Sequence, residues 1–324
     1  QNSSARFFLA YKKGVIVGRI AAIVNWIEIK EIKKNKVRFG WFDVIDDIAV
    51  SKLLLEQVIY FGKKHKLDHI EGPVGFSNLD KAGLLIKGFE EPSTMITIYN
   101  YPYYATHLKE LGFSLLAQWV EYEIKIANFE DSPEKVKRFS GVIIKRFNLK
   151  VLDFKNKKEI IPYIDQMFNL LDETYNKLQT FVPIQDYQIE HYKKRYFKYV
   201  HKDFVKCVVD KNNRLIAFTI TMPSFTRALQ RINGKVTFFN IYNLLKAMWF
   251  NNRASFYLIG VHPDYQNKGI TAIIFNEIQK TFNKHNITIV ETNPELNENT
   301  AIQKLWKNYE NRQHKRRATF TKNI

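Results

Sequence analysis

The sequence predicts a mixed α/β fold, with α-helices packed on a mixed sheet, in two halves that share one order of elements. Segments with strand-like alternation are separated by segments with helical apolar spacing, and this order occurs twice. Near residue 260, an apolar run passes through a tight turn directly into a helix. Such alternation is typical of layered α/β domains, and 324 residues exceed the usual single-domain size. We therefore expect two domains, 1–138 and 139–324.

The first half reads as a hairpin, a third strand and alternating helices and strands. Lys12-Lys13-Gly14 turns the hairpin, and the polar stretch 128–138, with Pro133, is the expected linker. The sequence starts at Gln1 without methionine and enters a strand almost at once. We therefore treat the first domain as one from which an N-terminal part can be missing. Strands are expected at 7–11, 15–24, 37–44, 69–73 and 115–126, and helices at 48–65 and 103–111.

The second half repeats this plan and adds the strand–turn–helix unit. A hairpin turns at Lys211-Asn212-Asn213, and the segment 224–252 interrupts the passage to the next strand. Strands are expected at 149–154, 204–209, 215–222, 254–261, 287–294 and 318–321, and helices at 160–174, 187–199, 270–278 and 299–310.

Composition limits the partners and the compartment. The formal net charge of +18 predicts an anionic partner, which could be a phosphate-bearing ligand, an anionic membrane or nucleic acid. The single Cys207 excludes a disulfide framework, and its strand-like surroundings predict a buried structural thiol. Because no apolar run approaches the roughly 20 residues that span a bilayer and no leader is visible, we expect a cytoplasmic protein.

Two groups of basic or histidine residues are not expected to form a functional site. The basic run 312–317 favours a solvated turn. The histidines lack His-x-x-x-His spacing with nearby carboxylates, so we expect no metal site.

The segment from Gly260 to Thr271 carries the most specific signal. It places a turn at a helix N-terminus, where backbone N–H groups lack intrahelical partners and the positive end of the helix dipole faces outward. Such a turn can hold a pyrophosphate by main chain alone, and Gly269 lets the phosphates approach closely. A strand-to-helix turn without a ligand is the alternative.

This segment resembles the acyl-CoA-binding loop of the GNAT acyltransferase superfamily, Gln/Arg-x-x-Gly-x-Gly/Ala. Gln266 and Gly269 stand at matching positions, whereas Thr271 replaces the usual Gly or Ala. The resemblance implies an acyl-CoA co-substrate, with backbone amides of the preceding strand near the acyl carbonyl. The residues implied to bind it are Leu258, Ile259, Gly260, Val261, Gln266, Asn267, Lys268, Gly269, Ile270 and Thr271.

The corresponding turn of the first half has no glycine and carries Asp46 and Asp47. Carboxylates there repel an anion, so we expect a degenerate first GNAT-like domain and donor binding by the second alone. One of the two aspartates is predicted to be a helix N-cap.

Several phrases resemble one bacterial family of GNAT-type N-acyltransferases, similar to the bacterial ceramide synthases. Those enzymes join a long acyl chain from a thioester to the amine of a sphingoid base. The resemblance implies an acyl-CoA-dependent N-acyltransferase acting on an amine, with a lipid amine as one acceptor class. The phrases are Val17–Ala22, Phe39–Phe42, Glu71–Pro73, Gly83–Pro92, Leu111–Phe113, Met222-Pro223, Asn233-Gly234 and Leu296–Asn299.

Acyl transfer to an amine requires a base and a proton for the departing thiolate. Glu291, near the end of its strand, is the predicted base, or else a carboxylate held by Lys or Arg. The resemblance makes Tyr309 the predicted acid, with core packing beside Trp306 as the alternative. Asn293 and Asn299 are expected to bind the pantetheine arm or to cap the following helix.

The aromatic and basic stretch 237–250 resembles an interfacial segment, so we expect peripheral contact with an anionic membrane. An amphipathic helix packed on the sheet is the alternative. Two other functions stay open: aminoacyl transfer from tRNA, and a non-catalytic module that binds a lipid or thioester. The recognisable loop disfavours nucleic acid as the partner.

Overall fold

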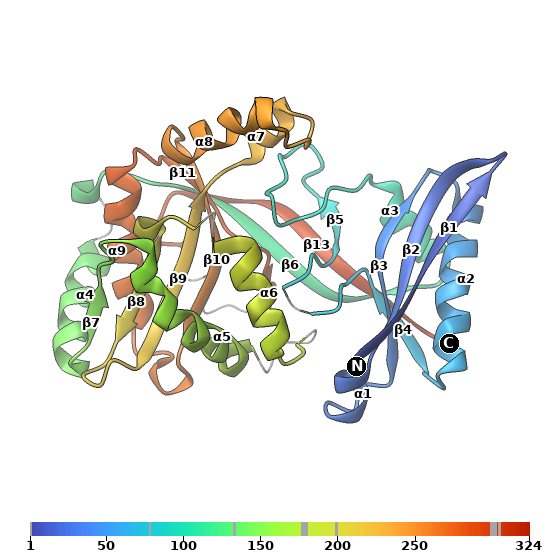
Figure 1. Cartoon of the computed structure of the whole chain (residues 1–324), viewed down its shortest axis with the longest axis horizontal. Coiled ribbons are helices and arrows are strands. Elements are labelled where there is room, and N and C mark those ends of the chain that lie inside the picture. Colours follow the sequence, from blue (N-terminus) through green and yellow to red (C-terminus); the bar gives the residue numbers. More distant parts are fainter. Residues whose placement is uncertain are drawn as a thin grey trace.

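The computed structural model describes residues 2–77, 79–131, 134–175, 181–197, 200–298, 303 and 306–324. Within them, one mixed sheet runs through the whole molecule (Figure 1). Its strand order is β1-β2-β3-β4-β13-β6-β11-β10-β9-β8-β7, and β5 pairs with β13 while β12 pairs with β6.

The first half matches the predicted order of elements. Its hairpin turns at Lys13 and Gly14, both with positive φ as the tight turn requires. Its strands are β1 (Ser3–Lys12), β2 (Val15–Asn25), β3 (Lys36–Val44), β4 (His69–Gly72), β5 (Leu84–Lys87) and β6 (Ser114–Lys125). Its helices are α1 (Trp26–Lys30), α2 (Ile48–Lys64) and α3 (Tyr103–Glu110).

The second half repeats that order with more helices. Its strands are β7 (Lys150–Leu152), β8 (Val205–Val209), β9 (Leu215–Pro223), β10 (Arg253–Val261), β11 (Ile289–Glu291), β12 (Glu295–Leu296) and β13 (Asn311–Asn323). Its helices are α4 (Glu134–Phe147), α5 (Ile161–Tyr175), α6 (Asp186–Tyr196), α7 (Thr226–Arg231), α8 (Ile241–Trp249) and α9 (Ile270–Lys284). Cys207 is buried in β8 as predicted. Most of the helix predicted at 299–310 lies outside the described residues.

The last strands of the two halves lie side by side at the centre of the sheet. β6, which ends the first half, lies between β13 and β11, whereas β13, which ends the second half, lies between β4 and β6. In Figure 1 these two long strands cross from one half to the other. Each half therefore receives a central strand from its neighbour, and the division at residue 138 stays a prediction.

Two sequence predictions were wrong in this part of the chain. The expected linker 128–138 contains the start of α4, whose Ile143 and Ile144 pack in a cluster with α9. The run 312–317 is no solvated turn but part of β13, where Lys315 and Arg317 are fully buried. Both segments are rich in charged residues, which favoured solvated structure in the sequence, although the elements they belong to have buried residues.

The buried cations of β13 are compensated from β6. Both oxygens of Glu121 are used: one lies 2.6 Å from Arg317 Nε and the other 3.1 Å from Lys315 Nζ, and all three side chains are inaccessible to solvent. Lys315 also donates to the carbonyl of Pro92 at 2.9 Å, and Arg317 to that of Ile98 at 2.6 Å. Removing one member of such a buried group leaves uncompensated charge.

We predict that Glu121→Ala lowers the free energy of unfolding by about 3–5 kcal/mol, because Lys315 and Arg317 lose the carboxylate that contacts both of them. Urea unfolding followed by fluorescence measures this change. The control is Asp43→Ala, which breaks the exposed 2.6 Å pair with Arg19 and should cost at most about 1 kcal/mol. Equal losses in the two variants would contradict the role given to Glu121.

Candidate active site

The strand–turn–helix unit is built as the sequence predicted. β10 leads through a short 3-10 turn (Pro263–Tyr265) into α9. His262 caps that turn, since its Nδ1 accepts a hydrogen bond from the amide of Asp264 at 3.2 Å. The side chain of Gln266 donates to the carbonyl of Val261 at 3.1 Å and so ties the turn to the end of the strand. His262 therefore stabilises the turn.

Gly269 is the N-cap of α9 and has a left-handed backbone conformation that is unfavourable for residues with a side chain. Its φ is +80°, and a Cβ built on it would lie 2.7 Å from Cδ1 of Ile143 on α4. The amide of Ala272 donates to the Gly269 carbonyl at 2.9 Å. The amides of Gly269, Ile270 and Thr271 find no acceptor among the described residues. An anion at this helix N-terminus would meet several free donors and the positive end of the helix dipole.

The equivalent helix of the first half differs in charge. Asp47 is the N-cap of α2: its side chain accepts from the amide of Ala49 at 3.0 Å and pairs with Lys12 at 2.9 Å. The predicted N-cap is thus confirmed for Asp47. A carboxylate already occupies the position at which an anion would bind.

Beyond the middle of β10, the neighbouring strands separate. β10 pairs with β11 only as far as Ser255 and Glu291. β11 then ends, while β10 continues to Val261 with an irregular register between Phe256 and Leu258. The next short strand, β12, pairs with β6 instead of β10. The predicted donor-binding residues 258–261 therefore lie in a part of β10 that pairs with β9 but not with β11.

Several side chains donate hydrogen bonds to carbonyls at this part of β10, among them Thr219 to Leu258 at 3.1 Å. Asn293 Nδ2 donates to the carbonyl of Tyr257, and the Tyr175 hydroxyl donates to that of Ile259 at 3.0 Å. Asn293 Oδ1 is buried without a partner among the described residues. An unpaired buried acceptor indicates that a donor is missing at this position. Asn299, the other predicted pantetheine ligand, lies outside the described residues.

The two predicted catalytic side chains do not come together. Val290 packs in the apolar cluster against α9, and Tyr309 packs against the same cluster. Because successive side chains of a strand point to opposite faces, Glu291 faces away from Tyr309. Tyr309 lies just before β13, and burial raises its pKa to about 12.

Glu291 lies among basic side chains. Its carboxylate oxygens lie 3.1 Å from Arg253 Nη2 and 3.7 Å from Lys315 Nζ. Arg253 also contacts Glu123. These contacts match the alternative interpretation of Glu291, in which Lys and Arg hold its carboxylate at the end of a strand.

A third carboxyl group, Glu295, lies at the separation of the strands and was missed from the sequence. Trp306 Nε1 donates to its two oxygens at 2.9 and 3.2 Å. Burial raises the pKa of Glu295 to about 8, and the hydrogen bonds from Trp306 and Thr292 offset only part of that rise. No sequence signal separates Glu295 from a surface carboxylate, since its burial depends on the pairing of β12 with β6 and on the distant Trp306.

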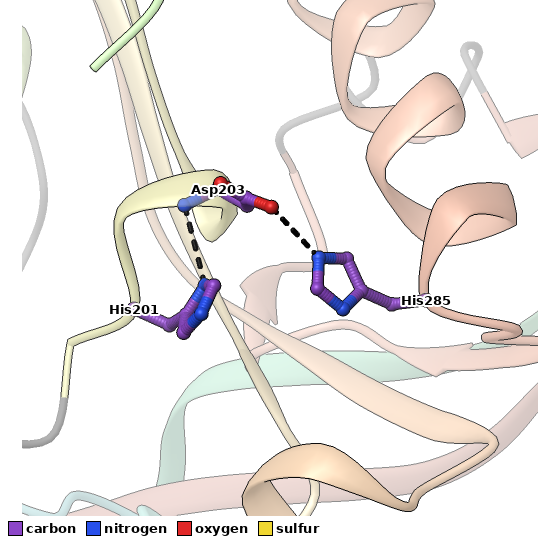
Figure 2. A group of neighbouring side chains, drawn as sticks. All are labelled: His201, Asp203 and His285. Carbon is purple, nitrogen blue, oxygen red and sulfur yellow. Dashed lines mark hydrogen bonds and ion pairs between the residues drawn. The ribbon is translucent and has the colours of Figure 1, made fainter. Parts of the chain in front are cut away.

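The structure also groups His201, Asp203 and His285, with possible ligand atoms within 4.8 Å of one another. In Figure 2, the backbone amide of Asp203 points to His201 Nδ1 and its carboxylate to His285 Nε2, at 3.3 and 2.9 Å. Lys202 and Lys284 each lie 2.8 Å from that carboxylate. Burial alone would raise the pKa of Asp203, but hydrogen bonds from these lysines and His285 lower it well below its usual range. A metal ion would have to compete with two ammonium groups for the Asp203 carboxylate. The cluster is therefore better described as ion pairs that hold this carboxylate than as a metal site.

The pKa of Glu295 predicts how stability depends on pH. The folded pKa of about 8 lies above the ordinary value of 4.5, so between these values the folded chain binds more protons and stability falls as pH rises. In Glu295→Gln this slope should disappear, and the variant should gain roughly 3 kcal/mol relative to the parent between pH 5 and pH 8. Urea unfolding of both proteins across this range measures it. Parallel stability curves would contradict the raised pKa.

Sequence comparison finds distant similarity to known proteins. No protein-family model matches the chain. The chain is 24% identical over 327 residues to protein YghO of Escherichia coli K12, covering 98% of this chain and 82% of YghO. It is 22% identical over 261 residues to the bacterial ceramide synthase of Caulobacter vibrioides, covering 75% of this chain and 62% of that protein.

Among solved structures, a tandem GNAT protein from the clavulanic acid biosynthesis pathway matches with a TM-score of 0.53. The sequences are 10% identical, and the match covers 99% of this chain and 83% of that one. The chain therefore has the GNAT fold, in the tandem arrangement expected from its repeated order of elements.

Proposed function

We propose that this chain is an N-acyltransferase that moves an acyl group from a CoA thioester to the nitrogen of an amine. The N-terminus of α9 carries the proposal, because it combines Gly269 at positive φ with amides that find no acceptor among the described residues. A diphosphate suits this position, and Lys268 adds a positive charge beside it. The buried, unpaired Asn293 Oδ1 would accept from an amide N–H of the pantetheine arm.

The reaction needs three events at the separated strands. The amine nitrogen forms a bond to the thioester carbonyl carbon, the carbonyl oxygen takes negative charge, and the carbon–sulfur bond then breaks. Backbone amides of residues 258–261 that face away from β9, on the side that β11 leaves open, would stabilise the oxyanion. A base takes the proton from the nitrogen, and the departing thiolate takes a proton, for which Tyr309 is the proposed acid.

Two carboxyl groups compete for the role of base. Glu291 is the residue expected from the sequence, but Arg253 and Lys315 already engage its oxygens. Glu295 is partly buried beside Tyr175 and Trp306, and its pKa of about 8 lies near the range in which a general base works best. We propose Glu295 as the second candidate and separate the two by experiment.

A lipid amine such as a sphingoid base is the proposed class of acceptor, with the reaction at the inner face of the membrane. The name of the Caulobacter relative, a ceramide synthase, supports this class. Incubation with a panel of acyl-CoAs and long-chain or small amines, followed by mass spectrometry, should yield an N-acylated amine and free CoA.

We predict that CoA raises the melting temperature of the parent protein and does not raise that of Gly269→Glu. The glutamate would put bulk and negative charge where the phosphates bind, and at 100 times Kd the lost stabilisation is about 2.7 kcal/mol. The control is Gly14→Glu, a glycine with φ of +79° and open surroundings in the β1–β2 turn.

A second variant covers the case in which Gly269→Glu fails to fold. Lys268→Glu reverses the charge of the loop without backbone strain and should weaken CoA binding. Unaltered affinity for CoA in Lys268→Glu, or stabilisation of the parent by aminoacyl-tRNA with none by CoA, would overturn the proposed donor.

We predict that substituting the true base lowers kcat about 10²–10⁴-fold while stabilisation by CoA is retained. If Glu295 is the base, Glu295→Gln shows this loss, and the parent rate rises with pH up to about 8, because the carboxyl must lose its proton to act. If Glu291 is the base, Glu291→Gln shows it instead. Parent-like turnover in both variants would exclude Glu291 and Glu295 as the base.

A further inference from the structure

The segment between β9 and β10 combines aromatic and basic residues and contains no acidic ones. From Ser224 to Asn252 there is no Asp or Glu, although the whole chain has 32 acidic residues. The basic residues are Arg227, Arg231, Lys235 and Lys246, and the aromatic residues are Phe225, Phe238, Phe239, Tyr242, Trp249 and Phe250.

Most of these aromatic side chains lie in solvent. Phe239 is 94% exposed, Phe238 87% and Phe250 79%. Tyr242, Leu245 and Trp249 are also exposed, and α8 has no buried residue at all. A helix of a globular protein normally buries an apolar face. The exposed apolar face of α8 and the preceding turn (Phe238–Asn240) is called the aromatic patch below.

The aromatic patch is held on a well-defined support. Asn251 donates to the carbonyls of Ser224 and Ala247 and so joins the two ends of the segment. Thr226, the first residue of α7, donates to the carbonyl of Ser93 at 3.1 Å. In Figure 1, α7 and α8 lie together at one edge of the molecule, beyond the ends of β9 and β10. The patch therefore projects from the sheet instead of covering it.

We propose that the aromatic patch docks on the surface of an anionic lipid bilayer. Phe238 and Phe239 would enter the boundary between headgroups and acyl chains, and Lys235 and Lys246 would contact the lipid phosphates. Aromatic residues with flanking basic residues are typical of segments that lie in the plane of a membrane interface. No helix among the described residues is long and apolar enough to cross a bilayer, and docking requires none.

The charge of the patch distinguishes this partner from a second copy of the chain. In a two-fold dimer, the same surface of each copy faces the other. Lys235 and Lys246 would then approach the basic side chains of the other patch, and the segment supplies no carboxylate to compensate them. An anionic lipid surface complements both the aromatic and the basic side chains. This docking does not depend on the proposed acyl transfer.

Sedimentation with vesicles tests the proposal on the full chain. The parent should bind vesicles of phosphatidylcholine with 30% phosphatidylglycerol more tightly than vesicles of phosphatidylcholine alone, and added salt should weaken binding. The double variant Phe238→Ser/Phe239→Ser should lose at least about tenfold in partition coefficient. Its melting temperature should not change, because both rings are exposed. The control Phe7→Ser removes a ring that is 69% exposed on β1.

Charge reversal tests the basic part separately. Lys235→Glu/Lys246→Glu should weaken binding to the anionic vesicles, whereas Lys52→Glu/Lys109→Glu, at exposed positions outside the patch, should weaken it less. A parent that stays in the supernatant with anionic vesicles overturns the proposal. So does a dimer, seen by analytical ultracentrifugation, that dissociates in Phe238→Ser/Phe239→Ser, since the patch would then be an interface between copies.

Discussion

The pairing of β6 with β13 is the constraint on which the rest of the structure depends. These strands come from opposite halves of the chain, and each lies between its partner and a strand of the other half. Burying Lys315 and Arg317 at this position is tolerable only because Glu121 faces both on the neighbouring strand. A second group, Glu28 and Glu71 with Lys36 and Arg38, uses the same combination in the first half. Buried cations therefore lie next to buried carboxylates both within the first half and where the two halves meet.

The candidate site depends on this central pair. β6 pairs with β11 and then with β12, so its course carries the chain away from β10 after Glu291. The separation leaves the carbonyls of Tyr257 and Ile259 to the side chains of Asn293 and Tyr175. It also leaves Glu295 partly buried beside Trp306, and this burial raises its pKa, whereas Glu291 lies among cations. Two carboxylates four residues apart thus have opposite electrostatic environments.

Local patterns predicted much of this fold. Strand-like patterns located most strands, turn residues located both hairpins, and the resemblance of the Gly269 loop predicted the GNAT fold. The strands β5 and β12 were not predicted, and β13 was predicted only at 318–321. The sequence could not predict features that depend on distant partners. The exchange of β6 and β13 depends on pairing across about 190 residues. The burial of Lys315 requires Glu121, and that of Glu295 requires Trp306. α4 was missed although its apolar residues recur at helical spacing, because the charged residues between them favoured a linker.

The direction of β10 links the proposed donor site to the aromatic patch. β10 begins directly after α8 and its connecting residues and ends at the loop that leads to Gly269. A nine-residue strand spans about 30 Å, so the patch and the helix N-terminus lie at opposite ends of one rigid element. A membrane that binds at α8 would therefore leave the Gly269 loop in water, where the charged phosphates of CoA stay hydrated. The separated strands lie between these two ends, which is the position at which a lipid amine from the membrane side and a thioester from the water side would meet.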